Sequence, residues 1–253
     1  MRGDRRGRMK PRDLVPTLAA LALVIVTVSL GNWQVRRADE KRALHASREA
    51  AARDPAIRMP GGEIDPASLQ GRRVAARGEL LPRWTVFVDN RTHKGIAGFH
   101  VLSPLRITGS DRHVLVLRGW VASDPRERAR LPDLATPAGE VEIEGIAERD
   151  LEKALELGRS PPPGPHDRLW QNADIASFAH WSGLAMQPIV VRETVAPRIG
   201  AAVFDDGLVR DWPDPGSGVD RHLGYAFQWY ALAVLAAGLW VRFVLFGRRK
   251  AGR

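Results

Sequence analysis

The residues best suited to chemistry lie at the start of the second of two apolar segments. There His222, Tyr225 and Trp229 follow one another at spacings of three and four residues. In an α-helix such residues lie on one face, because each residue advances the helix by about 100°. An imidazole, a phenol and an indole would therefore form a row along one side of a helix that enters a membrane.

Two interpretations of this row are open. Aromatic side chains collect at membrane surfaces, and such a belt accounts for Trp229, Tyr230 and Trp240. It does not account for the imidazole of His222 or for Gln228, because polar groups near membrane depth usually serve a function. A neutral imidazole with aromatic neighbours can ligate the iron of a flat, apolar porphyrin.

The rest of the sequence contains no recognisable catalytic motif. The chain has no cysteine, which excludes disulfides, thiolate metal sites and cysteine nucleophiles. A glycine-rich phosphate loop, G-x-S-x-G and H-E-x-x-H are absent as well. We interpret Ser110, Asp111 and His113 as turn residues, and we expect the six histidines other than His222 to belong to no site. A membrane-anchored exported hydrolase that uses His113 or His166 is an alternative that has no motif.

Two apolar segments, Leu14–Leu30 and Tyr225–Phe246, determine the expected architecture. Their lengths suit a bilayer core of about 30 Å, so we expect transmembrane helices over residues 14–33 and 222–246. Basic residues precede the first segment as in a signal peptide, but no small-residue cleavage site follows it, so we expect a retained anchor. The two helices would hold the domain of residues 34–221 against one face of the membrane.

The charge distribution predicts which face that is. Residues 1–13 contain six basic and two acidic groups, and residues 242–253 contain five basic groups and no acid. The remainder holds 27 groups of each sign, so the net charge of +9 resides in the tails and no nucleic-acid partner is expected. Short basic flanks stay in the cytoplasm, so we expect residues 1–13 and 247–253 to be cytoplasmic and the domain to face outward. The thirteen residues before the first segment are too few and too acidic for a usual mitochondrial presequence, which favours the bacterial plasma (inner) membrane.

The middle of the chain predicts one α+β domain with an antiparallel, β-rich sheet. Alternation of apolar and polar residues predicts strands over Arg73–Leu80, Trp84–Asp89, Gly98–Leu102, His113–Val121, Val141–Ala147 and Met186–Arg192. Residue composition and helix-breaking glycines and prolines predict helices over Gln34–Arg53, Arg149–Gly158 and Asn172–Trp181. The same signals predict a hairpin turn over Asn90–Gly95 and a linker to the membrane over Phe204–Asp220.

Three motifs in this order resemble the surfeit locus 1 family, in its bacterial form, over nearly the whole chain. They are Leu30-Gly31-Asn32-Trp33-Gln34 with Arg37, then Arg118-Gly119-Trp120-Val121, then His222-Leu-x-Tyr225-Ala-x-Gln-Trp229. The resemblance implies an assembly factor for cytochrome c oxidase, not an enzyme, that binds haem a and delivers it to the oxidase core subunit. One departure is Asp220, where many relatives have asparagine.

Carried onto this sequence, the resemblance assigns His222 as an axial ligand of the haem iron and places Tyr225 and Trp229 along the haem face. No other metal is implied. The expected partners are the oxidase core subunit, the haem a synthesis machinery and membrane lipid. We also expect Gly31 and Gly224 to let the two helix ends approach closely. The alternative within the family is a scaffold that stabilises the nascent oxidase subunit without holding haem.

Overall fold

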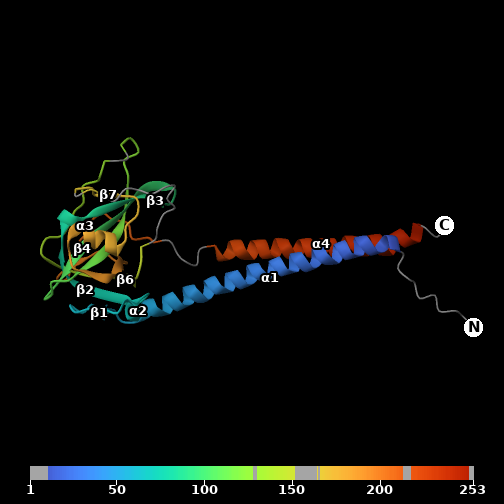
Figure 1. Ribbon diagram of the computed structural model, residues 1–253, viewed down its shortest axis with the longest axis horizontal. Helices are drawn as coiled ribbons and strands as arrows, with labels where there is room; N and C mark the ends of the chain where they lie inside the picture. The colour runs from blue at the N-terminus through green and yellow to red at the C-terminus, as the bar shows by residue number, and fades with distance from the viewer. Residues whose placement is uncertain (1–10, 128–129, 152–163, 165, 213–217, 251–253) are drawn as a thin grey trace, which may run out of the picture. The chain divides into compact units, whose positions relative to one another are not determined.

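The computed structural model describes residues 11–127, 130–151, 164, 166–212 and 218–250 (Figure 1). It divides into two compact units, one formed by residues 1–47 with 213–253 and the other by residues 48–212. The first unit contains two long helices, and the second is built around a β-sheet. This arrangement confirms the predicted fold class of two apolar helices that flank one β-rich domain.

The two long helices are α1 (Pro11–Arg53) and α4 (Val219–Lys250). By length and composition, both are able to cross a membrane. Helix α1 runs unbroken to Arg53, so the prediction that the first helix continues through residues 34–53 is confirmed. The membrane boundaries at residues 14–33 and 222–246 and the orientation of the chain stay predictions.

Five strands form the centre of the β-rich domain: β2 (Arg73–Leu80), β4 (Ile96–Ile107), β5 (His113–Ala122), β6 (Glu140–Glu148) and β8 (Met186–Glu193). Their pairings run from β2 to β4, β5, β8 and β6 and back to β2, so the five strands close into a barrel. The β5–β8 pair is parallel, and the other four pairs are antiparallel. A closed ring leaves none of these strands with an unpaired edge.

The core of the barrel follows the two-residue period of its strands. Alternate residues of β2 and β6 belong to one buried apolar cluster, with members Val74, Ala76, Leu80, Val141, Ile143 and Ala147. The residues between them point the other way, since successive side chains in a strand alternate between faces, and most of them carry charges. On that face Arg77 pairs with Glu142 across the two strands at 2.9 Å. The strand predictions succeeded because this alternation is visible in the sequence.

Shorter elements cover the barrel. They are β1 (Ile57–Arg58), α2 (Pro66–Leu69), η1 (Pro82–Trp84), β3 (Val86–His93), β7 (Leu169–Trp170), α3 (Ile175–Ser182), β9 (Arg198–Ile199) and β10 (Ala202–Val203). Helix α3 confirms the helix predicted near Asn172–Trp181. It begins after Asp174, whose carboxylate accepts the backbone N–H of Ser177, and it ends at Gly183 in the left-handed region.

One local prediction differs from the structure, and another is not tested by it. The turn predicted over Asn90–Gly95 is shorter, because β3 continues past an irregularity between Val88 and Arg91. The chain reverses at Lys94 and Gly95, both of which have positive φ, as the favoured two-residue hairpin turn requires. The helix predicted over Arg149–Gly158 lies largely outside the described residues.

Candidate functional site

The helix pair brings the first and third sequence motifs together. The imidazole Nδ1 of His222 on α4 lies 2.7 Å from the amide Oε1 of Gln34 on α1. The hydroxyl of Tyr230 donates a hydrogen bond of 2.7 Å to Oδ1 of Asn32. These two bonds join residues that are 188 and 198 positions apart in the chain. They hold α1 and α4 side by side, as Figure 1 shows.

Small side chains line the contact between the two helices. Thr27 on α1 and Ala226 and Ala233 on α4 are buried, although most of their neighbours are exposed. Gly31 lies beneath the ring of Tyr230, and a Cβ added to it would be 2.6 Å from Cε1 of that ring. Small residues permit such close approach between membrane helices. The expectation for Gly31 therefore agrees with the structure.

The expectation for Gly224 is wrong. A Cβ added at Gly224 would meet no atom within 4 Å, so its lack of a side chain is not what permits the helices to approach.

The predicted row is present on α4, but its members have different surroundings. His222 hydrogen-bonds α1, Trp229 is half-buried, and Tyr225 is 47% exposed. At about 100° per residue, Tyr225 and Trp229 lie to one side of His222, and the buried Ala226 lies to the other. The row therefore begins at the helix contact and extends along one flank of α4, where aromatic surface is accessible.

The chemistry of His222 fits a haem iron. One ring nitrogen is occupied by Gln34, and across the described part of the chain Nε2 has no hydrogen-bond partner. One imidazole nitrogen held by the protein and the other available is the usual arrangement of a histidine ligand. Gln34 belongs to the first sequence motif, but no local pattern in the sequence indicates its contact with a residue 188 positions away.

The other histidines do not assemble a site. Burial lowers the pKa of His113, and burial together with the charge of Arg91 lowers the pKa of His100 to about 4. The described residues contain no cluster of three metal-ligating side chains. Ser110 is a turn residue as predicted: its Oγ donates to the carbonyl of Gly61 and accepts the N–H of Arg112. The hydrolase alternative therefore has no assembled catalytic group within the described residues.

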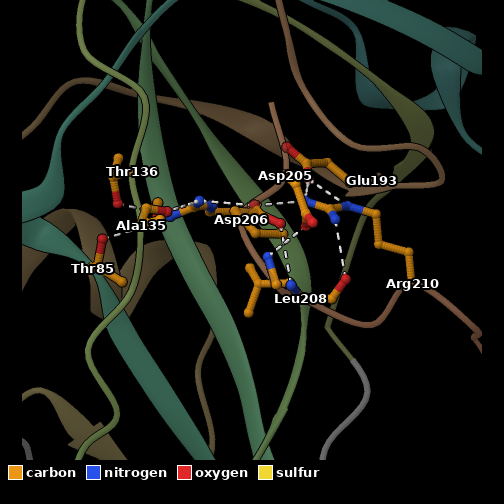
Figure 2. A network of polar contacts seen from close by, with 11 residues as sticks. Thr85, Ala135, Thr136, Glu193, Asp205, Asp206, Leu208 and Arg210 are labelled. Atoms are coloured by element: carbon orange, nitrogen blue, oxygen red, sulfur yellow. Dashed lines mark hydrogen bonds and ion pairs between the residues drawn. The ribbon is translucent and has the colours of Figure 1, made fainter. Parts of the chain in front are cut away.

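A second polar cluster, which the sequence did not reveal, lies inside the β-rich domain (Figure 2). Arg118 on β5 is fully buried and donates to the Asp206 carboxylate at 2.9 Å and to the carbonyl of Ala135 at 3.0 Å. Arg210 donates to the same carboxylate and to Glu193 on β8, each at 2.7 Å. We call Arg118, Glu193, Asp206 and Arg210 the buried ion network. Its two guanidinium and two carboxylate groups balance in charge.

Glu193 is only partly paired in this network. Both of its contacts with Arg210 use Oε2, while Oε1 is buried without a hydrogen-bond partner. Burial raises the pKa of Glu193 to about 7, although the neighbouring Arg210 opposes this shift.

The motif Arg118-Gly119-Trp120 docks the segment that contains Asp206. Trp120 exchanges two backbone hydrogen bonds with Val209, at 2.8 and 2.9 Å. A Cβ at Gly119 would lie 2.7 Å from Cβ of Leu208, so only glycine fits at this crossing. The prediction of a linker over Phe204–Asp220 is therefore wrong for residues 206–212. Asp206 and Val209 are held on β5, and Arg210 and Trp212 hydrogen-bond Glu193 on β8.

Comparison with known proteins agrees with the motifs and the architecture. The sequence model described as the SURF1 family matches residues 21–234. A SURF1-like protein of Monosiga brevicollis is 27% identical over 92% of this chain and 88% of its own length. A SURF1-like protein of Rickettsia felis is 26% identical over 91% and 96%. The cytochrome oxidase assembly protein SHY1 of Saccharomyces cerevisiae is 30% identical over 71% of this chain and 47% of its own length.

Proposed function

Because this chain belongs to the SURF1 family, we propose that it is an assembly factor for cytochrome c oxidase that binds haem a and delivers it to the oxidase core subunit. The assembly role is supported by the name of the SHY1 relative. The haem part rests on one observation: a histidine on an apolar helix has one ring nitrogen bonded to Gln34 and the other available.

The proposed site assigns a distinct part to each member of the row. When bound, the haem iron would supply a coordination position for a neutral imidazole. His222 would provide Nε2 as that ligand. Tyr225 and Trp229 would provide apolar ring surface on the flank of α4 and exclude water from it.

The proposed setting is a bacterial plasma membrane. Helices α1 and α4 would cross it with both termini in the cytoplasm and the β-rich domain outside. Its partners would be the oxidase core subunit, the haem a synthesis machinery and lipid. The protein would make and break no covalent bond, so we propose a binding and transfer function without catalysis.

The test is an absorption spectrum of the protein purified from cells that make haem a. We expect a Soret band in the unaltered protein, and its loss or strong shift in His222→Ala while the protein still inserts in the membrane. Tyr225→Phe keeps the ring and should bind haem better than Tyr225→Ala. Trp229→Phe should weaken binding modestly, because a smaller ring remains on the flank of α4.

The remaining histidines provide matched controls. Substitution by glutamine, one at a time, should retain haem content and oxidase assembly at His45, His93, His100, His113, His166 and His180. An unchanged spectrum and normal oxidase levels in His222→Ala would contradict the haem-ligand proposal and favour the scaffold alternative. Loss of haem from one of the six control variants would move the ligand into another part of the chain.

A further inference from the structure

We propose that Gln34 is a positioning residue for His222: its amide oxygen holds the proton on Nδ1 and so keeps Nε2 deprotonated for a ligand. This inference rests on the proposed function, since it concerns the same histidine. It adds a role for a residue on α1, the helix that does not carry the aromatic row.

The geometry supports this role because the atom that faces the His222 imidazole is an amide oxygen. Oε1 of Gln34 lies 2.7 Å from Nδ1 of His222, which is a short and therefore strong contact. An amide oxygen can only accept a hydrogen bond, so Nδ1 must donate. A neutral imidazole carries one proton, and Nε2 is left with its lone pair. The opposite tautomer would place two lone pairs against each other at this distance.

Contacts close to Gln34 hold this part of α1 against α4. On the same helix, Gly31 packs against the ring of Tyr230 and Asn32 accepts the hydroxyl of that residue. These contacts set the rotation of α1 against α4 a few residues away from Gln34. Within the described residues, Gln34 is the hydrogen-bond partner of the His222 ring. The tautomer of His222 therefore depends on one side chain that is not part of α4.

An alternative explanation is that the bond only joins the two helices. Tyr230 and Asn32 form an interhelical hydrogen bond of the same 2.7 Å length without touching His222. Tyr230→Phe removes this bond and keeps the ring on Gly31, so it is the matched control. If the bond only joins the helices, loss of either hydrogen bond should affect the His222 tautomer and haem affinity to a similar extent. If Gln34 positions His222, only loss of the Gln34 bond should affect them.

The first experiment measures the tautomer in the absence of haem. Full-length protein with ¹⁵N-labelled histidine is placed in lipid nanodiscs, and the ring nitrogen shifts of His222 are recorded by NMR. We expect the Nδ1–H form in the unaltered protein, in Gln34→Glu, which keeps an acceptor oxygen, and in Tyr230→Phe. In Gln34→Met, which keeps the length and loses the acceptor, we expect the Nε2–H form to become the major one.

The second experiment titrates the same proteins with haem a and follows the Soret band. Loss of a residue that orients a metal-ligating histidine typically weakens binding about 10- to 100-fold. We expect a loss of that size in Gln34→Met and an affinity close to that of the unaltered protein in Gln34→Glu and Tyr230→Phe.

The results separate this inference from the proposed function. An Nε2–H tautomer in the unaltered protein, or full haem affinity in Gln34→Met, would overturn the role of Gln34 while His222 stayed the ligand. Equal losses in Gln34→Met and Tyr230→Phe would overturn it in favour of simple helix joining. Unchanged haem binding in His222→Ala would instead refute the proposed ligand itself.

Discussion

At the residue scale, we expect the buried ion network of Arg118, Glu193, Asp206 and Arg210 to do more to select one structure than to stabilise it. Removing charges from water is costly, and buried pairs are often no more stabilising than apolar residues of the same volume. Loss of one partner is costly in a different way, because it leaves the other charge buried and unpaired. Asp206 is held by both Arg118 and Arg210, so we expect these ion pairs to fix the position of the segment that contains Asp206.

The pKa of Glu193 predicts a pH dependence of stability. Its folded-state pKa is raised to about 7 from an ordinary value of 4.5, so the folded protein binds the proton more tightly than the unfolded chain. The contribution is complete below pH 4.5 and is lost as the pH rises toward 7. We expect Glu193 to lower the free energy of unfolding across this window by about 1 kcal/mol per pH unit. Glu193→Gln should remove this contribution, so the difference in the free energy of unfolding between the variant and the unaltered protein should change across the window, as measured by denaturant unfolding in detergent at several pH values.

Glu142 provides the control for this measurement. Hydrogen bonds from Arg77 and Arg198 lower its pKa, so its contribution is present above pH 4.5 and is lost only as the pH falls below that value. Glu142→Gln should leave the slope between pH 4.5 and 7 unchanged. If Glu193→Gln keeps the slope of the unaltered protein, the carboxylate of Glu193 is ionised throughout this range.

Single residues also show which features of the site can be predicted from the sequence. His222, Tyr225 and Trp229 could be placed on one helix face because their spacing is a local property. The partner of His222 could not be identified, since Gln34 lies on another helix. Arg118 was similarly part of a motif, but its partner Asp206 lay in a segment whose Gly, Pro and Asp content is typical of linkers.

At the element scale, local periodicity predicts strands but not their order. The residues of β2, β5, β6 and β8 alternate, and each of these strands appears close to its predicted range. The closure of the barrel through β2–β6 and the parallel β5–β8 pair depend on contacts between distant segments. Neither feature leaves a mark on the alternation of a single strand, so neither could be predicted.

The crossing at Gly119 gives a prediction for an element. Gly119→Ala places a Cβ 2.7 Å from Cβ of Leu208 and should force the backbone around Leu208 away from β5. We expect a loss of about 1–3 kcal/mol in the free energy of unfolding, the usual cost of overpacking. Gly62→Ala is the control, because a Cβ at Gly62 would meet no atom within 4 Å. Thermal unfolding should show a lower midpoint for Gly119→Ala and little change for Gly62→Ala; equal midpoints would contradict the close packing.

At the scale of the whole molecule, the net charge lies in different segments of the chain from the β-rich domain. Its excess positive charge lies in the terminal segments, while the region between them is balanced. Basic flanks are retained on the cytoplasmic side during insertion. We therefore predict that the terminal segments set the orientation of the chain in the membrane.

This separation predicts the topology of the chain. A reporter that works only in the cytoplasm should be active when fused after Arg253. A reporter that works only after export should be active when inserted in an exposed turn of the domain, such as Gly109 in the turn between β4 and β5. Activity of the opposite kind at both positions would reverse the orientation and the side of the membrane on which the row begins.

The hydrogen bond between His222 and Gln34 also has a consequence for the life of the polypeptide. Gln34 leaves the ribosome 188 residues before His222 does. At synthesis rates of roughly 5–20 residues per second, His222 is synthesised about 10–40 s after Gln34. During this interval α1 has no α4 to pair with, and a truncated or stalled chain never acquires one. The contact can therefore form only after α4 has been synthesised, so only chains that contain both helices can present the paired histidine.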